Sequence, residues 1–490
     1  MLGLLGGCFA LPDEPSVPEL TAGTTATSPA ESGTANETAA ETESETETET
    51  TQNTTPAAST EKVTAAAAKS TAATTAGPTV PPPRTTLSTT HTTATAATTT
   101  ATTATTAPPR PVPPKSETFR AVWVSCLELD KLFSGASVSK AAAALDAIMD
   151  NCAKWGMTAV IFHVRAMSDA YYKSTYFPPA KSAAKLLDAG FDPLAYAVEA
   201  AHKRGIELHA WVNPYRVGRD KSHARSEDIF TQDGLTYYIP TSEPVKALIL
   251  NGIRELVNGY GIDGIHFDDY FYPNGAASEN TAAAFEKKLY EAYFQEAGSS
   301  ALAPGGWRRQ HVDALIGGVY RTVHSRKNCV FGISPSSDYK KTYSQMYADP
   351  KKWMAGTGYI DYLAPQIYFG FSHATVPFDK TVEQWTAYPR ARSVNLYVGV
   401  AAYKIGLSPD RYAGVSGAGE WAVSDNILAR SAKYLHEKGL GQIYFSYTYL
   451  FADTARSLDS WTDSAGKTVK QSYNKAVAQR EIDNLLAYWG

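Results

Sequence analysis

Short apolar runs alternate with amphipathic segments from Phe119 onward, and the apolar residues of those segments recur at helical spacing. The apolar runs predict strands at 121–124, 158–164, 206–212, 265–267, 330–333, 362–368, 396–400 and 442–447. The segments between them predict helices, among them 138–155, 194–203, 281–297 and 312–327. This alternation is typical of parallel strands joined by crossover helices. It predicts an α/β fold of the closed (β/α)8 TIM-barrel type, with an open doubly wound sheet as the alternative.

The chain before the barrel has a different composition. Residues from about 11 to 115 are almost all Thr, Ala, Ser, Pro and Glu, with hardly an aromatic ring among them. Such a stretch buries too little apolar surface to offset the entropy of ordering, so we expect a disordered spacer. We therefore divide the chain into a signal-like segment at 1–8, a low-complexity linker at 9–116 and a folded domain at 117–490.

Leu5-Gly6-Gly7-Cys8 has the residue order of a bacterial lipobox, in which cleavage before the cysteine leaves it to be lipid-modified. A signal peptide also needs a positively charged region and a long apolar region before that site. Almost nothing of either region precedes Cys8 here. A true start further upstream would explain this, and an incidental cysteine is the alternative. We expect an extracytoplasmic protein anchored to the membrane by a lipid at Cys8, with the spacer separating the domain from the membrane.

The overall composition excludes several partners. A net charge of −4 without a basic stripe argues against nucleic acid, and no glycine-rich phosphate fingerprint follows a predicted strand. Cys126, Cys152 and Cys329 lie in apolar contexts without a paired spacing, which favours buried thiols. His163, His209, His266 and Asp268 show no metal-ligand spacing. We expect no cofactor and no metal, and we expect a monomer.

Two adjacent acids, Asp268 and Asp269, end the predicted strand within the motif GIDGIHFDDYFYP, which spans residues 261–273. Like charges this close repel, so each acid needs a partner or the two share a proton. One acid capping a helix and the other pairing with an arginine is the structural alternative. Because enzymes with this fold place their chemistry at the carboxyl ends of the strands, we predict that Asp268 and Asp269 are catalytic.

Polar and aromatic residues follow the other predicted strands as well. Flat rings suit the apolar faces of sugars, and amides, carboxylates and arginines suit their hydroxyl groups, so the pattern indicates a polysaccharide partner. A phosphate site would need more lysines and a glycine nest. The predicted substrate-binding residues are His163, Arg165, Asp169, Asn213, Tyr215, Arg216, His266, Tyr272, Asp338, Gln366, Tyr368 and Tyr403.

Five motifs in a fixed order make the chain similar to a known family. FRAVWVSCLEL, HAWVNPYR, GIDGIHFDDYFYP, FGISPSS and YLAPQIYF together resemble the bacterial glycosyl-hydrolase-like family 10, over about residues 119–449. The resemblance implies an exported, often lipid-anchored TIM-barrel glycosidase. At least one member of this family resembles an enzyme that cuts peptidoglycan glycan strands freed of their peptide stems. It places Asp268, Asp269, Arg165, Asp169, Asn213, Arg216 and Gln366 at strand-end positions of the family.

Two glycosidase mechanisms fit these acids. In the two-carboxylate scheme Asp268 is the nucleophile or base, and the acid comes from Asp338, Asp169 or Glu128. In the substrate-assisted scheme the acetamido group of the sugar attacks, with Asp268 orienting it and Asp269 as the acid. DGIHFDD is also loosely similar to the DGxDxDxE strand of chitinases, although His266 and Tyr270 replace two of its acids. Peptidoglycan sugars carry acetamido groups, so we favour the second scheme. A catalytically inactive glycan-binding barrel is the competing function, and an esterase lacks a GxSxG elbow.

Overall fold

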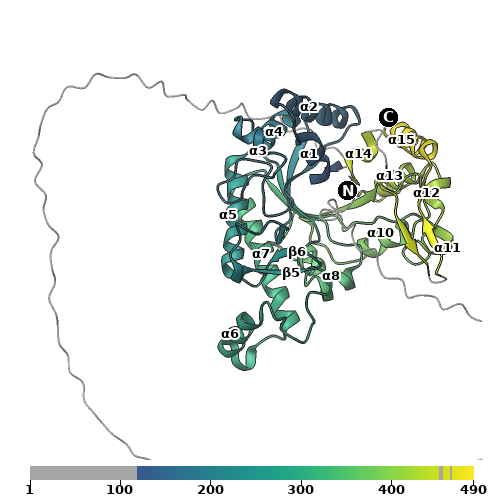
Figure 1. Cartoon of the computed structure of the whole chain (residues 1–490). Coiled ribbons are helices and arrows are strands. Elements are labelled where there is room, and N and C mark those ends of the chain that lie inside the picture. Colours follow the sequence, from purple (N-terminus) through teal and green to yellow (C-terminus); the bar gives the residue numbers. More distant parts are fainter. Residues whose placement is uncertain (1–118, 452–455, 464–465) are drawn as a thin grey trace, which may run out of the picture. The chain divides into compact units, whose positions relative to one another are not determined.

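The computed structural model describes residues 119–451, 456–463 and 466–490, so the predicted linker and Cys8 lie outside the described residues. The predicted TIM barrel is confirmed, because parallel strands close into a barrel in the order β1-β12-β10-β9-β8-β7-β3-β2. These strands are β1 (Arg120–Val124), β2 (Ala159–Arg165), β3 (Glu207–Val212), β7 (Gly264–Phe267), β8 (Val330–Ile333), β9 (Tyr362–Leu363), β10 (Asn395–Ala401) and β12 (Gly441–Phe445). Figure 1 shows them at the centre with helices around them.

Helices lie between the barrel strands, as the sequence pattern predicts. They are α1 (Cys126–Phe133), α2 (Val138–Lys154), α3 (Ala184–Asp188), α4 (Pro193–Lys203), α5 (Glu243–Gly259), α6 (Lys287–Ala297), α7 (Pro304–Val323), α8 (Tyr339–Gln345), α9 (Pro350–Ala355), α10 (Phe378–Thr386), α11 (Gly414–Gly417), α12 (Glu420–Val423), α13 (Ile427–Glu437), α14 (Tyr447–Phe451) and α15 (Lys475–Trp489). Caps set several of their starts: the side chain of Ser137 accepts from Lys140 N–H before α2, and Asp192 accepts from the first turn of α4. The apolar residues of α2 are buried, as their spacing predicts.

Several parts of the fold differ from the prediction. β9 ends at Leu363 rather than at residue 368, because Pro365 has no N–H for a ladder and Gln366 makes only isolated bridges. α6 begins at Lys287 rather than at 281, and α7 runs from Pro304 to Val323 rather than from 312 to 327. The pattern also missed a small antiparallel sheet in the loop after β3. Its strands are β4 (Arg216–Gly218), β5 (Ile229–Gln232) and β6 (Leu235–Tyr238), with β6 in the middle.

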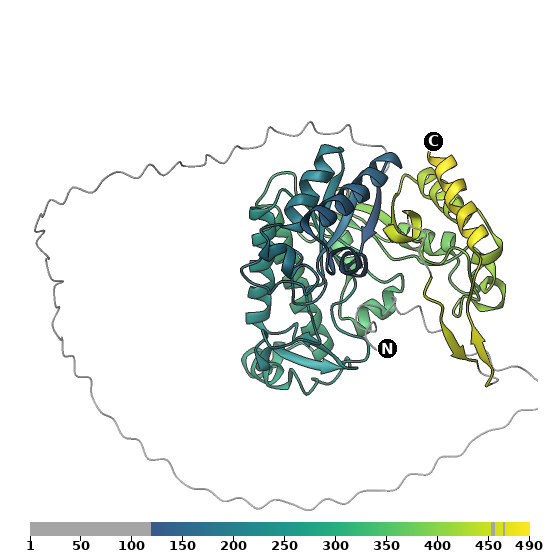
Figure 2. The same cartoon turned by 45° about the horizontal axis from the view of Figure 1, so that its top comes forward.

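Two further two-stranded sheets lie toward the carboxyl end of the chain. β11 (Leu407–Ser408) pairs with β15 (Ser472–Tyr473), and β13 (Ser460–Thr462) pairs with β14 (Thr468–Lys470). α15 is held to the barrel through Glu481, whose carboxylate accepts the N–H groups of Ile427 and Leu428 at the start of α13. Figure 2 shows α15 beside this part of the barrel. The last element therefore caps a barrel helix that precedes β12.

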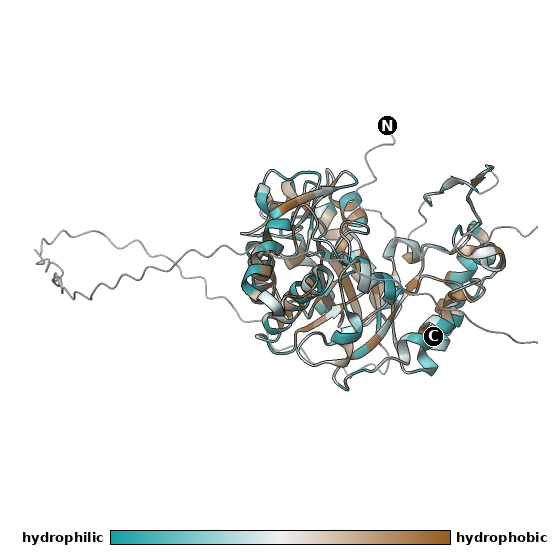
Figure 3. Cartoon of the chain, turned by 90° about the horizontal axis from the view of Figure 1, so that it is seen from below, coloured by the Kyte–Doolittle hydropathy of each residue, from teal (hydrophilic) through white to brown (hydrophobic). Residues whose placement is uncertain are grey.

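Glycines that face the barrel interior leave room for large rings. A methyl group on Gly264 would lie 2.9 Å from the His209 ring, and one on Gly332 would overlap the ring of Tyr362. Barrel interiors are filled by layers of side chains rather than left open. Here the rings of Trp123, Trp211 and Tyr362 belong to that filling. The colouring in Figure 3 shows apolar segments among the central strands and polar ones on the outer helices.

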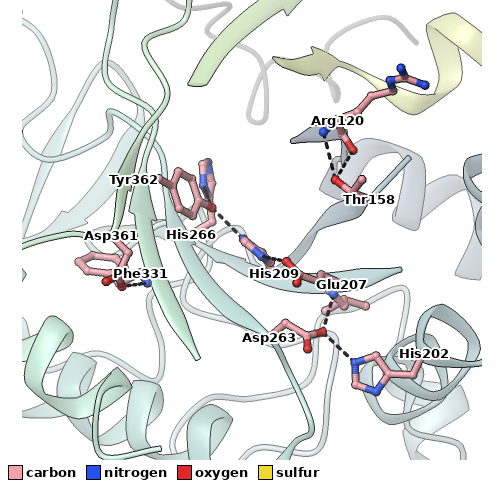
Figure 4. Close-up of polar contacts among 11 residues, drawn as sticks. Arg120, Thr158, His202, Glu207, His209, Asp263, His266, Phe331, Asp361 and Tyr362 are labelled. Carbon is pink, nitrogen blue, oxygen red and sulfur yellow. Dashed lines mark hydrogen bonds and ion pairs between the residues drawn. The ribbon is translucent and has the colours of Figure 1, made fainter. Parts of the chain in front are cut away.

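A chain of hydrogen bonds runs through this interior (Figure 4). Trp123 Nε1–H donates to Nε2 of His266 at 3.2 Å, so the proton of this histidine is on Nδ1. His266 Nδ1 lies 2.9 Å from the Tyr362 hydroxyl, which lies 2.9 Å from Nδ1 of His209. Burial holds the pKa of His266 well below its usual value, so the ring is neutral. Tyr362 therefore accepts from His266 and donates to His209.

Two acids that precede barrel strands, Asp263 and Asp361, bind N–H groups at the amino-terminal end of the barrel (Figure 4). Asp263 accepts from Leu208 N–H of β3 and lies 2.7 Å from His202 Nε2. Asp361 accepts from Phe331 N–H of β8 in the same way. These acids pair strand N–H groups with side chains, which a closed sheet needs at its ends. Cys126, Cys152 and Cys329 are buried and unbridged, as predicted, and no helix in the described residues is long and apolar enough to span a membrane.

Candidate active site

Asp268 and Asp269 directly follow β7, at the carboxyl end of the barrel strands. Both side chains are buried, each being 2% exposed. Trp211 Nε1–H, from β3, donates to Asp268 Oδ2 at 3.2 Å, and Tyr270 N–H donates to Asp268 Oδ1 at 3.2 Å. Both oxygens of Asp268 are therefore held in place by donors from two different parts of the mouth.

The pKa of Asp268 is raised well above its ordinary value, first by burial and then by the negative charge of Asp269. The positive charge of Arg216 and the bonds from Tyr270 and Trp211 act in the opposite direction. Two carboxylates this close cannot both ionise easily, so their titrations are coupled. The bonds that Asp268 accepts favour its ionised form and act against the rise in its pKa.

His163 and Arg216 lie beside the acid pair. The His163 ring stacks on Trp211, with 3.7 Å between ring centroids and 8° between planes. The Arg216 guanidinium lies 3.6 Å from the centre of the Tyr270 ring. Burial and the charge of Arg216 lower the pKa of His163 well below its usual value, so the imidazole is neutral. Arg216, the first residue of β4, thus reaches the mouth from the sheet that sequence reasoning missed.

Asp169 is a third acid, in the loop after β2. Burial and the negative charge of Asp130 raise the pKa of Asp169 to about 6, while Arg165 acts against the rise. Arg165 itself is buried, donates to Pro214 O at 3.0 Å and packs on the Phe177 ring. A carboxyl group that titrates near pH 6 is able to exchange a proton at physiological pH.

Aromatic rings and an amide lie on the other side of the acid pair. Burial and then the charge of Asp269 raise the pKa of Tyr368, which places this hydroxyl near the acids. Tyr368 packs edge-on against Tyr403, with 5.7 Å between centroids. Gln366 donates from Nε2 to Ser334 O at 2.9 Å, and Asn213 accepts from Trp211 Nε1 at 2.9 Å. The geometry therefore brings together Asp268, Asp269, His163, Asn213, Arg216 and Tyr368, with Tyr403 packed against Tyr368.

Other predicted site residues have structural contacts instead. Tyr215 and Tyr272 are buried, and the Tyr272 hydroxyl donates to Glu286 Oε2 at 3.1 Å. His266 lies in the barrel interior in the network described above, which indicates a supporting role. Asp338 Oδ1 accepts the N–H groups of Lys340 and Lys341 and thereby caps α8, which is a structural contact.

Glu128, a candidate acid of the two-carboxylate scheme, is tied up by the protein. One of its oxygens accepts from Ser125 N–H at 2.5 Å, and the other accepts from the Ser446 hydroxyl and Thr448 N–H at 2.9 and 2.6 Å. It therefore ties the loop after β1 to the loop after β12. Sequence reasoning undervalued Trp211, whose indole donates to Asp268, although the alternation of residues 209, 211 and 213 already places it with Asn213 on one strand face.

No group of three or more His, Cys, Asp or Glu side chains within the described residues is arranged to hold a metal ion.

Comparisons with known proteins identify a family and several similar proteins. The family described as Glycosyl hydrolase-like 10 matches residues 118–413. The chain is similar to the glycosyl hydrolase YngK of Bacillus subtilis (strain 168), at 34% identity over 317 residues, covering 58% of this chain and 61% of that protein. It is also similar to the glycosyl hydrolase DigH of Escherichia coli (strain K12), at 28% identity over 302 residues, covering 54% of this chain and 67% of that protein. The match thus spans less than two thirds of the length of YngK.

Among solved structures, the chain is similar to the glycoside hydrolase domain of PgaB (BpsB) from Bordetella bronchiseptica. The identity is 12% and the TM-score is 0.45, with 69% of this chain and 96% of that chain covered. A likeness at this level adds nothing to the geometry described above.

Proposed function

This chain belongs to the glycosyl hydrolase-like 10 family, and we propose that it is a glycoside hydrolase that cleaves a cell-wall polysaccharide. The observation that carries the proposal is the buried acid pair at the end of β7, in which Asp268 has a raised pKa. A proton kept on adjacent carboxyl groups at neutral pH is what protonation of a glycosidic oxygen requires. We propose peptidoglycan glycan strands without peptide stems as the substrate.

The contacts of Asp268 support a substrate-assisted reaction. In this proposal Asp268, held by Trp211 and Tyr270, accepts the N–H of the 2-acetamido group and orients its carbonyl oxygen toward the anomeric carbon. Asp269 gives its proton to the glycosidic oxygen as the bond to the anomeric carbon breaks and the acetamido oxygen bonds to that carbon. Water then attacks the anomeric carbon, the bond from that carbon to the acetamido oxygen breaks and restores the acetamide, and the attacking water gives a proton to Asp269.

The two-carboxylate scheme is the second candidate mechanism. The pKa of Asp169, which is raised to about 6, favours it. In that scheme Asp169 protonates the leaving oxygen and Asp268 acts from the other face of the sugar. Strands whose sugars have been de-N-acetylated separate the two schemes. Substrate assistance predicts that they are not cleaved, and the two-carboxylate scheme predicts that they are.

Incubation of the full chain with peptide-free glycan strands, chitin oligomers and α-glucans tests the function itself. We expect new reducing ends from the first substrate only, measured by mass spectrometry, with the anomeric configuration of the product read by NMR. Tight binding without any product would instead support the inactive glycan-binding barrel. We also propose that the protein acts outside the cytoplasm, anchored through a lipid at Cys8, which mass spectrometry of the membrane fraction tests.

A further inference from the structure

The outer wall of the barrel carries a groove that is separate from the acid pair. It has a volume of about 1010 Å³ and runs along α7, with α5 on one side and the segment from α8 to Tyr359 on the other. A smaller hollow of about 500 Å³ shares Leu250, Gly318 and Arg321 with it, so the two are continuous. Figure 1 shows α5 and α7 side by side on the outside of the barrel. We call this feature the α7 groove.

The α7 groove spans most of the height of the barrel. Leu302, which lines one end, precedes α7 on the side of the mouth, whereas Tyr359 precedes β9 on the opposite side. Along α7 the lining extends from Gly306 to Arg321, a distance of about 22 Å at 1.5 Å per residue. Pockets for single small molecules have volumes of about 300–1,000 Å³. A groove of this length and volume therefore suits several units of a polymer.

Cations outnumber acids along the α7 groove. Its lining contains two acids and five basic side chains, which are Lys246, Arg254, Arg309, Arg321 and Lys352. Arg321 is exposed and pairs with no acid among the described residues. Arg254 donates to the neutral side chain of Asn251 at 2.6 Å. The charges of these two arginines are therefore available to a ligand.

The two acids of the groove are engaged by the protein itself. Asp313 accepts from Lys352 Nζ and from Trp353 Nε1, both at 2.6 Å. Asp349 caps α9 by accepting the N–H of Lys352 at 3.1 Å, and it also accepts from the Tyr339 hydroxyl at 3.3 Å. The lining as a whole is positive, which makes it complementary to a negatively charged polymer.

Three tyrosines, Tyr320, Tyr343 and Tyr359, add flat rings to the lining. The ring of Tyr320 stacks on His324 with 4.0 Å between centroids, and the Arg309 guanidinium lies 4.1 Å from the centre of the Tyr343 ring. Rings held in this way lose little freedom when a ligand binds. Because aromatic rings suit the apolar faces of sugars, the lining favours a polysaccharide over a polymer of phosphates.

We propose that the α7 groove is a non-catalytic binding site for an acidic polysaccharide. The cations pair with the carboxylates of the polymer, and the tyrosine rings pack against its sugars. Since the acid pair lies elsewhere, a strand in the groove holds the protein on the polymer without being cleaved there. The proposal goes beyond the proposed function, because binding in the groove needs no hydrolysis.

Three polymers of similar length test the proposal with the full chain. Polygalacturonate has sugars and carboxylates, dextran has sugars alone, and inorganic polyphosphate has negative charge alone. In calorimetric titrations in one buffer, we expect polygalacturonate to bind at least about tenfold more tightly than either of the others. Equal or tighter binding of dextran or polyphosphate, or no binding of polygalacturonate, overturns the acidic polysaccharide as the occupant.

Variants locate the binding. Ala314→Glu adds a carboxylate at an exposed position of the groove, and we expect polygalacturonate to bind about 5- to 20-fold more weakly because the new charge repels it. Arg321→Gln removes one cation and weakens binding about 2- to 5-fold. Ala143→Glu makes the same change at an exposed position of α2 and leaves the affinity unchanged. Wild-type affinity in folded Ala314→Glu and Arg321→Gln overturns the α7 groove as the site.

Cleavage of short peptide-free glycan oligomers separates this proposal from the hydrolase. Ala314→Glu should cleave them at the wild-type rate, because the change lies outside the mouth, and a lost rate would overturn the non-catalytic role. If the wild type cleaves nothing, the hydrolase proposal fails while the titrations still decide the groove. If the wild type cleaves and both groove variants bind polygalacturonate normally, the groove fails and the hydrolase proposal stands.

Discussion

The indole of Trp211 joins two strands of the barrel at the acid pair, because its Nε1–H donates to Asp268 Oδ2 at 3.2 Å while its ring stacks on His163. The bond favours the ionised form of Asp268. Trp211 therefore helps to position this acid and, with Arg216 and Tyr270, acts against the rise in its pKa.

Trp211→Phe keeps an aromatic ring against His163 and removes the bond to Asp268. Since a bond to an ionised carboxylate lowers its pKa, its loss raises the pKa of Asp268 further. We expect the acidic limb of the kcat/KM profile to move to higher pH. Trp353→Phe, which removes a bond from another buried indole to Asp313, serves as the control and leaves the profile unchanged. A Trp211→Phe profile that matches the wild type contradicts this role.

Asp269→Asn removes the proposed acid and preserves the shape of the side chain. We expect turnover of peptide-free strands to fall about 10²- to 10⁴-fold, the contribution typical of a general acid, with glycan affinity largely retained. Steady-state kinetics and calorimetric binding measure the two effects separately. Asp313→Asn, on α7, is the matched change outside the mouth and should leave turnover near the wild-type value. Normal turnover by correctly folded Asp269→Asn removes this residue from the mechanism.

The pKa of Asp169 links stability to pH. Its folded value of about 6 lies above the ordinary 3.8, so the folded state favours the protonated form. The stabilising contribution of the Asp169 carboxyl group is complete when the pH is below its ordinary pKa of 3.8, and it is lost as the pH rises through about 6. The unfolding free energy of the wild type minus that of Asp169→Asn should therefore fall by up to roughly 3 kcal/mol as the pH rises across that window. Urea unfolding from pH 3.5 to 7.5 measures it, and a difference that does not vary with pH refutes the assignment.

Tyr362→Phe deletes the hydroxyl between His209 and His266 in the barrel interior. Both histidines then lose a partner in a place that water reaches poorly, and we expect a loss of about 1–3 kcal/mol in unfolding free energy. Chemical denaturation measures the loss. Tyr320→Phe, on the partly exposed face of α7, tests the removal of a hydroxyl outside the barrel and should change stability by less than about 0.5 kcal/mol. Equal stability of both variants would show that the interior network contributes nothing.

Local patterns along the chain were sufficient to predict much of the fold of this protein. The apolar periodicity predicted all the barrel strands, because buried parallel strands must be apolar whatever surrounds them. The prediction that the adjacent acids after residue 267 lie at the carboxyl end of a barrel strand is also confirmed, since they directly follow β7. Pro365 shows the limit of the pattern: the apolar run continues past it, but the missing N–H ends the ladder.

Only the tertiary structure decided which polar residues face the mouth. Tyr272 and Tyr368 both follow a barrel strand, yet Tyr272 bonds to buried Glu286 while Tyr368 lies near Asp269. Arg216 reaches Asp268 from a three-stranded sheet that no periodicity in the loop predicted. Periodicity reports whether a position is buried, whereas the partner that a buried polar group meets depends on residues far away in the chain. For that reason the acids were found from the sequence and the donors around them only in three dimensions.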